Sequence, residues 1–366
     1  MTTSRKVALV MAGGTGGHVF PALATARVLK RRGFEIVWLG TERGIEARLV
    51  PAEGIPVEWL SVSGVRGKGL LTLLAAPLRL CVAVSQAMRA IRKHRPRVVL
   101  GAGGFASGPG GVAAWLLRRP LVVHEQNAVA GMTNRVLARF ATRVLEGFPG
   151  SFGRGVKAER VGNPVRPEIV AVTAPEKRYP AREGRARLLV FGGSQGAARL
   201  NAVLPAAIAE LPRELRPDVL HQTGRHSHED TVQAYRSRGI EADVRPFIDD
   251  MASAYGWADL AVCRSGALTV AELAAAGVPA IMVPFPAAVD DHQTRNAEYA
   301  VQAGAARLLP ERELTPISLA ALLRDLLEQG RPRLEQMAHA ARRSAIVDAD
   351  ERLADACEQA ALGEVA

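Results

Sequence analysis

Short apolar runs alternate with glycine-rich turns and polar, helix-forming stretches along the first half of the chain. The run "KVALVMAGG" is followed by "PALATARVLKRRG", which we predict to be a helix that ends at Gly33. The segments "EIVWLG", "RVVLGAGG" and "PLVVHEQN" repeat the apolar run, and "GPGGVAAWLLRR" is a second predicted helix. This alternation predicts a parallel sheet with helices on both faces.

The pattern restarts after a proline-rich, charged segment between Val161 and Arg187, which we interpret as a linker. "RLLVFGGSQGAARLNAVL" is again strand, turn and helix, and a later helix ends at Gly277 and Pro279. We therefore predict an α/β protein with two Rossmann-like, doubly wound domains, residues 1–165 and 166–344. The last stretch, "PRLEQMAHAARRSAIVDADERLADACEQAAL", is predicted to be helix with no strand after it. We predict that its end, residues 345–366, completes the first domain, although the pattern also allows packing on the second.

Three glycine-rich turns follow predicted strands, at Gly13–Gly17, Gly101–Gly111 and Gly192–Gly196. Ligands of open α/β sheets bind beyond the carboxyl ends of the strands, where these turns lie. Glycine lets backbone N–H groups approach an anion closely, and the helix that follows adds its positive dipole. The turns therefore predict a site for a ligand that carries a diphosphate.

The common nucleotide fingerprints fit this chain poorly. "GTGGHV" has Val19 where the dinucleotide pattern needs Gly or Ala, and the Gly-Lys-Ser/Thr of a nucleoside-triphosphate loop is absent from the sequence. "GAGGFA", Gly101 to Ala106, does match the relaxed dinucleotide pattern, and Glu125 follows a strand roughly twenty residues later. An NAD-dependent enzyme therefore stays open as an alternative.

Length and composition indicate a two-domain protein without a disulfide framework. The 366 residues exceed one ordinary core, and the three cysteines are far apart. This cysteine usage favours a reduced, cytoplasmic setting. The one long uncharged window, residues 98–117, holds six glycines and a proline, so we predict no transmembrane segment.

The net charge of +11 is concentrated in one part of the chain. No Asp or Glu occurs between Trp59 and His124, and that stretch contains Arg66, Lys68, Arg79, Arg89, Arg92, Lys93, Arg95, Arg97, Arg118 and Arg119. Such a region is either a solvated basic face or a surface for an anionic partner, nucleic acid or membrane lipid.

Seven segments, in order and spread over almost the whole chain, resemble one family: "GGTGGHVFPALA", "GGFASGPG", "HEQNAVAGMTNR", "GNPVR", "FGGSQGA", "CRSGALTVAEL" and "DDHQTRNA". Together they resemble the MurG family of UDP-N-acetylglucosamine transferases, which make lipid II for peptidoglycan. The resemblance implies a GT-B fold, with the active site between two Rossmann-like domains. It also implies inverting transfer of N-acetylglucosamine from its UDP carrier to the C4 hydroxyl of undecaprenyl-diphosphoryl-muramoyl-pentapeptide (lipid I), with no cofactor and no required metal.

The segment "RSGALTVAEL" suits the donor. A helix that opens near Ala267 has free N–H groups in its first turn, which with the Thr269 hydroxyl suit the UDP phosphates. Glu272 lies about one turn further on and can accept from both ribose hydroxyls, although a helix dipole alone also favours an early Glu. The predicted donor segment is Ala267, Leu268, Thr269, Val270, Ala271 and Glu272.

The resemblance implies further donor contacts elsewhere in the chain. Main-chain groups near Ile248 match a uracil contact, and Ser194 and Arg166 match contacts to the diphosphate. Gln293, with His292 beside it, matches contacts to the sugar hydroxyls. Asn127 matches a donor-sugar contact from the first domain.

Displacement at an anomeric carbon needs a base for the attacking hydroxyl and charge relief for the leaving UDP. With UDP mainly on the second domain, Thr15, Gly16 and Gly17 would face the sugar and the acceptor diphosphate. His18 follows them and is our candidate general base, with Glu125 and His124 in reserve. The simpler interpretation is that His18 only donates a hydrogen bond and shapes the loop.

Leucine, tryptophan and arginine occur together in the basic region, as in proteins that rest on an anionic leaflet. A nucleic-acid surface would show more stacking aromatics among the basic residues. We therefore predict peripheral binding to the cytoplasmic face of the inner membrane, unless the leucines are core residues. The predicted patch is Arg66, Lys68, Leu70, Leu71, Leu74, Arg79, Trp115 and Arg118.

Two other function classes remain open at this stage. Another GT-B enzyme, such as a UDP-N-acetylglucosamine 2-epimerase or a different lipid glycosyltransferase, would share the two-domain pattern. A non-enzymatic anion-binding protein would share only the basic charge. Protein partners in cell-wall synthesis or cell division are implied by the resemblance alone.

Overall fold

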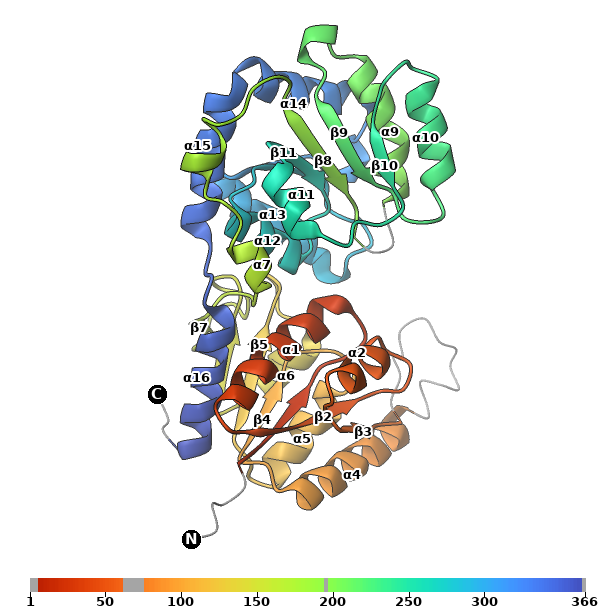
Figure 1. Cartoon of the computed structure of the whole chain (residues 1–366). Coiled ribbons are helices and arrows are strands. Elements are labelled where there is room, and N and C mark those ends of the chain that lie inside the picture. The colour runs from red at the N-terminus through yellow and green to blue at the C-terminus, as the bar shows by residue number, and fades with distance from the viewer. Residues whose placement is uncertain (1–5, 62–75, 194–196, 364–366) are drawn as a thin grey trace. The chain divides into compact units, whose positions relative to one another are not determined.

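The computed structural model describes residues 6–61, 76–193 and 197–363 (Figure 1). It divides into two compact units, one of Met1–Pro164 with Asp348–Ala366 and one of Val165–Val347. The chain therefore leaves the first unit, forms the second, and returns to the first with its last helix. Ser194 and the patch residues Arg66, Lys68, Leu70, Leu71 and Leu74 lie outside the described residues.

The first unit contains a seven-stranded sheet in which every neighbouring pair is parallel, in the order β3-β2-β1-β4-β5-β6-β7. The inner strand β1 is buried along its whole length, as expected for a parallel strand with helices on both faces. The strands are β1 (Val7–Met11), β2 (Glu35–Gly40), β3 (Val57–Trp59), β4 (Val98–Gly101), β5 (Leu121–Glu125), β6 (Arg143–Glu146) and β7 (Glu159–Arg160).

Helices cover both faces of this sheet. α1 ends where Gly33 takes a positive φ of 86°, which confirms the helix end predicted from the sequence. The helices of the unit are α1 (Gly16–Arg31), α2 (Glu46–Ala52), α4 (Ala76–His94), α5 (Ser107–Leu116), α6 (Met132–Leu137) and α16 (Ala349–Leu362).

The last helix, α16, belongs to the core of the first unit. Leu353, Ala354 and Cys357 pack in the same apolar cluster as residues of α1, β1 and β4. On the outside, Arg32 at the end of α1 pairs with three carboxylates of α16, those of Glu351, Asp355 and Glu358. Figure 1 shows α16 lying beside this sheet, far in sequence from its neighbours.

The second unit contains a six-stranded parallel sheet in the order β10-β9-β8-β11-β12-β13. Its strands are β8 (Arg187–Phe191), β9 (Asp218–Gln222), β10 (Asp243–Arg245), β11 (Leu260–Cys263), β12 (Ala280–Met282) and β13 (Ala306–Leu308). Its helices are α7 (Pro167–Val170), α8 (Pro175–Arg178), α9 (Ala198–Ala209), α10 (His228–Arg236), α11 (Met251–Trp257), α12 (Ala267–Ala276), α13 (His292–Gln302), α14 (Pro316–Glu328) and α15 (Gly330–Ser344).

Both sheets reverse their strand order between two adjacent strands, β1 and β4 in the first unit and β8 and β11 in the second. The carboxyl ends of such a pair form the crevice where open α/β sheets bind ligands. The predicted glycine-rich turns after β1, β4 and β8 therefore begin at these two points.

The C-terminal region differs from the single helix that the sequence predicts. α15 ends at Ser344 and α16 begins at Ala349, with Ala345 in an extended conformation between them. Two β-branched residues, Ile346 and Val347, fall at the break, and the acidic residues Asp350 and Glu351 suit the start of a new helix. α15 packs against α12 and α14 of the second unit, whereas α16 packs against the first.

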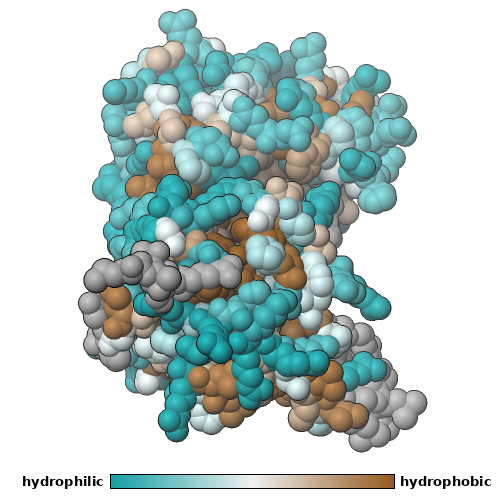
Figure 2. All heavy atoms as spheres, turned by 60° about the horizontal axis from the view of Figure 1, so that its bottom comes forward, coloured by the Kyte–Doolittle hydropathy of each residue, from teal (hydrophilic) through white to brown (hydrophobic). Residues whose placement is uncertain are grey.

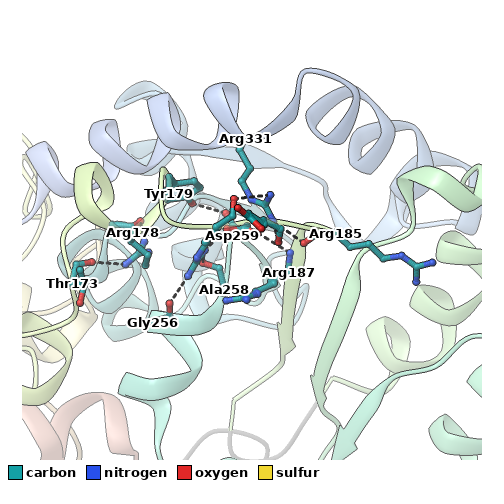
Figure 3. Close-up of polar contacts among 12 residues, drawn as sticks. Thr173, Arg178, Tyr179, Arg185, Arg187, Gly256, Ala258, Asp259 and Arg331 are labelled. Carbon is teal, nitrogen blue, oxygen red and sulfur yellow. Dashed lines mark hydrogen bonds and ion pairs between the residues drawn. The ribbon is translucent and has the colours of Figure 1, made fainter.

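The predicted linker is also more ordered than its composition indicates. It holds the one-turn helices α7 and α8 and is fixed to the second unit by Asp259, which is fully buried (Figure 3). The Asp259 carboxylate pairs with Arg182, accepts from the Arg187 backbone N–H and lies 3.5 Å from Arg331 of α15. Because a buried carboxylate needs such partners, this cluster joins the linker, β8 and α15.

Candidate functional site

The two glycine loops of the first unit touch through their backbones. A Cβ atom on Gly104 would lie 2.3 Å from the carbonyl oxygen of Gly13. Gly103 has a φ of 96°, and a Cβ there would lie 2.6 Å from Nδ1 of His18. Side chains at these positions would separate the loops, so glycine is required for the loops to meet at the reversal point.

The Glu46 side chain fixes the first glycine loop, Gly13–Gly17, through a hydrogen bond. Its side chain is fully buried and accepts from the Gly14 N–H at 2.9 Å, the Thr41 N–H at 3.1 Å and the Thr41 hydroxyl at 2.7 Å. A Cβ on Gly13 would overlap the same carboxylate. The sequence analysis missed Glu46, because its partner Gly14 lies in the turn after β1, 32 residues away, and shares no motif with it.

His18 lies in the first turn of α1, after Thr15, Gly16 and Gly17, and is half-buried. Its Nδ1 atom lies 3.0 Å from Oε1 of Gln126, just after β5. Gln126 also contacts the Ala102 carbonyl at 2.9 Å and Nδ1 of His124 at 3.1 Å. The structure therefore joins His18 to its reserve candidate His124, through a residue that the sequence analysis did not select.

His124 is almost completely buried, and its Nε2 lies 3.0 Å from the Gly162 carbonyl oxygen. Burial lowers the pKa of His124 to about 4, so this ring is neutral near physiological pH. A buried, neutral histidine in contact with protein on both ring nitrogens fits the transmission of a hydrogen-bond pattern better than the binding of substrate.

Both carboxylate oxygens of Glu125 accept hydrogen bonds from residues of its own loop. Oε1 accepts from the backbone and side-chain N–H groups of Asn127, and Oε2 accepts from the Gly131 N–H and the Asn134 amide. These four hydrogen bonds shape the turn that carries Asn127. They fit a structural role for Glu125 better than proton transfer or the binding of a ribose in an NAD site.

In the second unit, the start of α12 is tied to the start of α13. Ser265 donates its hydroxyl proton to the carbonyl oxygen of Gln293 at 2.8 Å, and the Asn296 amide donates to the Ser265 carbonyl at 3.1 Å. The Gln293 side chain accepts from the Phe285 N–H at 2.9 Å. The structure thus brings Gln293 and His292 close to the first turn of α12, residues Ala267 to Thr269.

Glu272, on the same helix, contacts two other polar side chains. Its carboxylate accepts from Arg166 at 3.2 Å and from the Tyr255 hydroxyl at 3.0 Å. Burial raises the pKa of Glu272, and the Arg166 guanidinium opposes this effect. The Arg166 side chain is 42% exposed, against 16% for Glu272, so the guanidinium end of the pair is open to solvent.

Ile248, which is also predicted to contact the donor, lies at the same end of this sheet and is buried in the turn that follows β10. Two further residues near this end have an unusual backbone conformation. Asp290 and Asp291 both have positive φ angles, 53° and 51°, directly before α13. Such angles are strained for residues with a side chain and often accompany functional loops.

The basic surface of the first unit includes exposed apolar side chains on α4 and α5. Arg79 is exposed between Leu78 and Leu80, which are 71% and 49% exposed. On α5, Trp115 is 54% exposed and packs against Phe140. Trp115, Leu116, Arg118, Arg119, Pro120, Phe140 and Thr142 line a hollow of about 500 Å³.

Figure 2 brings the lower face of Figure 1 forward and shows hydrophobic side chains in separate groups among hydrophilic ones. None of the helices described here combines the length and apolarity needed to cross a bilayer. Within the same described ranges, no three His, Cys, Asp or Glu side chains gather closely enough to hold a metal ion.

Comparison with known proteins gives one consistent result. Residues 8–146 match the glycosyltransferase family 28 N-terminal domain, and residues 187–353 match the C-terminal domain of the same family. The UDP-N-acetylglucosamine–N-acetylmuramyl-(pentapeptide) pyrophosphoryl-undecaprenol N-acetylglucosamine transferase of Nitrosococcus oceani is 56% identical over 355 residues, which cover 97% of this chain and 99% of the relative.

Solved structures agree with the sequence relatives. The crystal structure of Acinetobacter baumannii MurG matches with a TM-score of 0.87 and 41% identity, over 97% of this chain and 99% of that one. A putative UDP-N-acetylglucosamine 2-epimerase from Listeria monocytogenes matches with a TM-score of 0.67 over 97% of this chain and 96% of that one, at only 14% identity. That second likeness shows a shared fold alone.

The role of Glu46 in holding the first glycine loop can be tested by Glu46→Gln. An amide cannot accept at both former oxygen positions, so one of the Gly14 and Thr41 N–H groups loses its partner. We expect a loss of roughly 1–3 kcal/mol in unfolding free energy, the usual cost of an unsatisfied buried donor, and faster hydrogen exchange at Gly14 or at Thr41. Glu53→Gln, on an exposed pair with Arg27, is the control and should change neither measurement. Unchanged exchange at both Gly14 and Thr41 in Glu46→Gln would contradict this role.

Proposed function

This chain belongs to the MurG family within glycosyltransferase family 28, and on that premise we propose that it makes lipid II. It transfers N-acetylglucosamine, with inversion, from UDP-N-acetylglucosamine to the C4 hydroxyl of lipid I. The observation that carries this proposal is the 56% identity to a transferase of this name over 97% of the chain. The geometry of each unit supports it.

The second unit is proposed to bind the donor. The first-turn N–H groups of α12, at Ala267, Leu268 and Thr269, suit the UDP phosphates because they have no partner within the helix. Arg166 supplies a cation within reach of the same helix, since it pairs with Glu272. On binding, Glu272 would exchange contacts with Arg166 for the two ribose hydroxyls, which leaves the guanidinium for the diphosphate. Ile248, Gln293 and Ser194 keep the roles that the resemblance implies for them.

The first unit is proposed to bind the acceptor. The glycine loops present backbone N–H groups and the start of α1, which suit the diphosphate of lipid I. His18 is then placed to take the proton of the C4 hydroxyl while the bond from the anomeric carbon to UDP breaks. Asn127, on the loop shaped by Glu125, is proposed to contact the donor sugar.

The lipid-linked acceptor requires the enzyme to work at a membrane surface. We propose that the basic and apolar side chains of α4, of α5 and of the turn after α5 rest on the anionic cytoplasmic face of the inner membrane. Leu78 and Trp115 offer apolar contact, and Arg79, Arg89, Arg92 and Arg118 offer charge.

The reaction is tested by UDP release from UDP-N-acetylglucosamine, with and without a short-chain lipid I analogue. Acceptor-dependent release and a disaccharide product would support the proposal. Release without acceptor, or an epimerised free sugar, would contradict it and would move the enzyme to the epimerase class.

Replacement of the candidate base gives a sharper result. His18→Ala should lower kcat by ~10²–10⁴-fold, the usual contribution of a general base, with little change in UDP affinity. The kcat is measured with the same lipid I analogue, and the UDP affinity is measured by calorimetry. His339→Ala, on α15 of the second unit, is the matched control and should leave turnover unchanged. A loss of less than tenfold in His18→Ala would exclude the role of base.

Donor binding should depend on pH through Glu272. The carboxylate accepts two ribose hydroxyls only when ionised, and its pKa is raised in the free enzyme. Affinity for UDP-N-acetylglucosamine should therefore be full above that raised pKa and fall by roughly 10–100-fold as the pH drops through it. Calorimetric titration across this range should show a flat profile for Glu272→Gln and an unchanged one for the exposed Glu328→Gln. An unaltered profile in Glu272→Gln would refute the assignment.

The membrane surface can be tested with vesicles that contain anionic lipid. Reversing Arg79, Arg89 and Arg92 to Glu should weaken binding by about 100-fold or more, because each basic residue near such a surface contributes about 1 kcal/mol. Reversing Arg213, Arg236 and Arg238 in the second unit makes the same change in net charge and should have a smaller effect. Equal losses in the two triple variants would show that only net charge matters.

A further inference from the structure

A chain of hydrogen bonds runs from His18 into the core of the first unit. It passes from Nδ1 of His18 to Oε1 of Gln126, from Nε2 of Gln126 to Nδ1 of His124, and from Nε2 of His124 to the Gly162 carbonyl. Gln126 and His124 are each 1% exposed, so solvent does not compete for these contacts. The direction of every bond in this chain can be worked out from its two fixed acceptors.

The Gly162 carbonyl fixes the far end. A carbonyl oxygen only accepts, so Nε2 of His124, 3.0 Å away, carries a proton. Because burial keeps the His124 ring neutral, its Nδ1 is then a lone pair. That lone pair accepts from the atom of Gln126 that lies 3.1 Å away, which must therefore be the amide nitrogen.

The Ala102 carbonyl fixes the orientation of Gln126 independently. It lies 2.9 Å from Nε2 of Gln126 and accepts its second proton. Turning the amide over would place Oε1 against two acceptors, the Ala102 oxygen and the His124 lone pair, at hydrogen-bond distance. Both neighbours therefore direct the carbonyl oxygen of Gln126 toward His18.

Nδ1 of His18 lies 3.0 Å from this oxygen. Because an amide oxygen only accepts, a hydrogen bond here requires a proton on Nδ1. We propose that Gln126 is a positioning residue that holds the proton of neutral His18 on Nδ1, which leaves the lone pair on Nε2 as the basic atom. This inference rests on the proposed function, in which His18 takes the proton of the acceptor hydroxyl. Gly103 supports the same geometry, because a Cβ there would displace the ring.

A proton on Nδ1 suits His18 both before and after it takes the proton of the C4 hydroxyl. The lone pair on Nε2 accepts the C4 hydroxyl proton as the new oxygen–carbon bond forms, and the bonding electrons of the anomeric carbon–oxygen bond leave with UDP. The resulting imidazolium keeps its Nδ1–H against Oε1 of Gln126, whose dipole stabilises the positive charge. In serine-protease triads a carboxylate fixes the tautomer of the catalytic histidine and stabilises its imidazolium. Loss of the correct tautomer there costs about 10⁴-fold in kcat.

The tautomer of His18 is measured directly by NMR of the full chain with ¹⁵N-labelled histidine rings, at a pH where His18 is neutral. His18→Gln assigns the signals by their disappearance. We expect the pattern of a protonated Nδ1 and an unprotonated Nε2. A protonated Nε2 in the wild-type protein would overturn the proposal, and this readout requires no variant in the network to fold.

Gln126→Met keeps the side-chain length but removes both amide contacts. We expect the Nε2–H form of His18 to appear in its spectrum and kcat to fall by about 10–100-fold, as for losses of partners that orient a functional histidine, with a small change in KM. Gln359→Met makes the same exchange on α16, outside the network, and should behave as wild type. An unchanged Nδ1–H spectrum in Gln126→Met would refute the role of Gln126.

Failure of this inference and failure of the proposed function give different results. If His18→Ala keeps its turnover within tenfold, His18 is not the base, whatever its tautomer. If His18→Ala is inactive but the wild-type ring carries its proton on Nε2, the base stands and the role of Gln126 is wrong.

Discussion

The close approach of two backbone loops governs the first unit. Gly104 meets Gly13 at the ends of adjacent parallel strands, at a distance that excludes any side chain. Loops this close need support from below, because glycine itself supplies no packing. Glu46 supports one loop through its N–H groups, and Gln126 joins the other to His18 and His124. The polar groups buried at this point are thus satisfied by one another.

In the second unit the buried polar group is the carboxylate of Glu272, and one of its partners is a charged side chain. Its helix α12 begins at the reversal point of the sheet, and Glu272 and Arg166 form an ion pair one turn further along. Burial makes ionisation of Glu272 costly, and the exposed guanidinium lowers that cost. A ligand that offers hydroxyl donors to the carboxylate and an anion to the guanidinium can replace each partner of the pair. A nucleoside diphosphate carries both groups, which is why we propose that its ribose and diphosphate replace the two partners of this pair.

The sequence predicted well what depends on local pattern. The strand–turn–helix units around Gly33 and Gly277 are confirmed, because apolar runs and glycines with positive φ are local signals. The prediction of a single C-terminal helix was wrong, because the chain breaks at Ala345 and its two helices pack against different units. Glu46 and Gln126 were not predicted because each also contacts residues distant in sequence, Gly14 for Glu46 and His18 and Ala102 for Gln126. His18 could be selected from its position after the loop, but its proton could be placed only once Ala102 and Gly162 were located in space.

The return of the chain to the first unit has a consequence for biosynthesis. Leu353, Ala354 and Cys357 of α16 fill part of the core around β1 and β4, yet they are translated after the whole second unit. The nascent first unit therefore leaves the ribosome with an apolar groove uncovered, while residues 165–347 can already fold. Since translation proceeds at ≈ 5–20 residues per second, the groove stays open for roughly ten to forty seconds. A chaperone that shields apolar surface would find its target there during that interval.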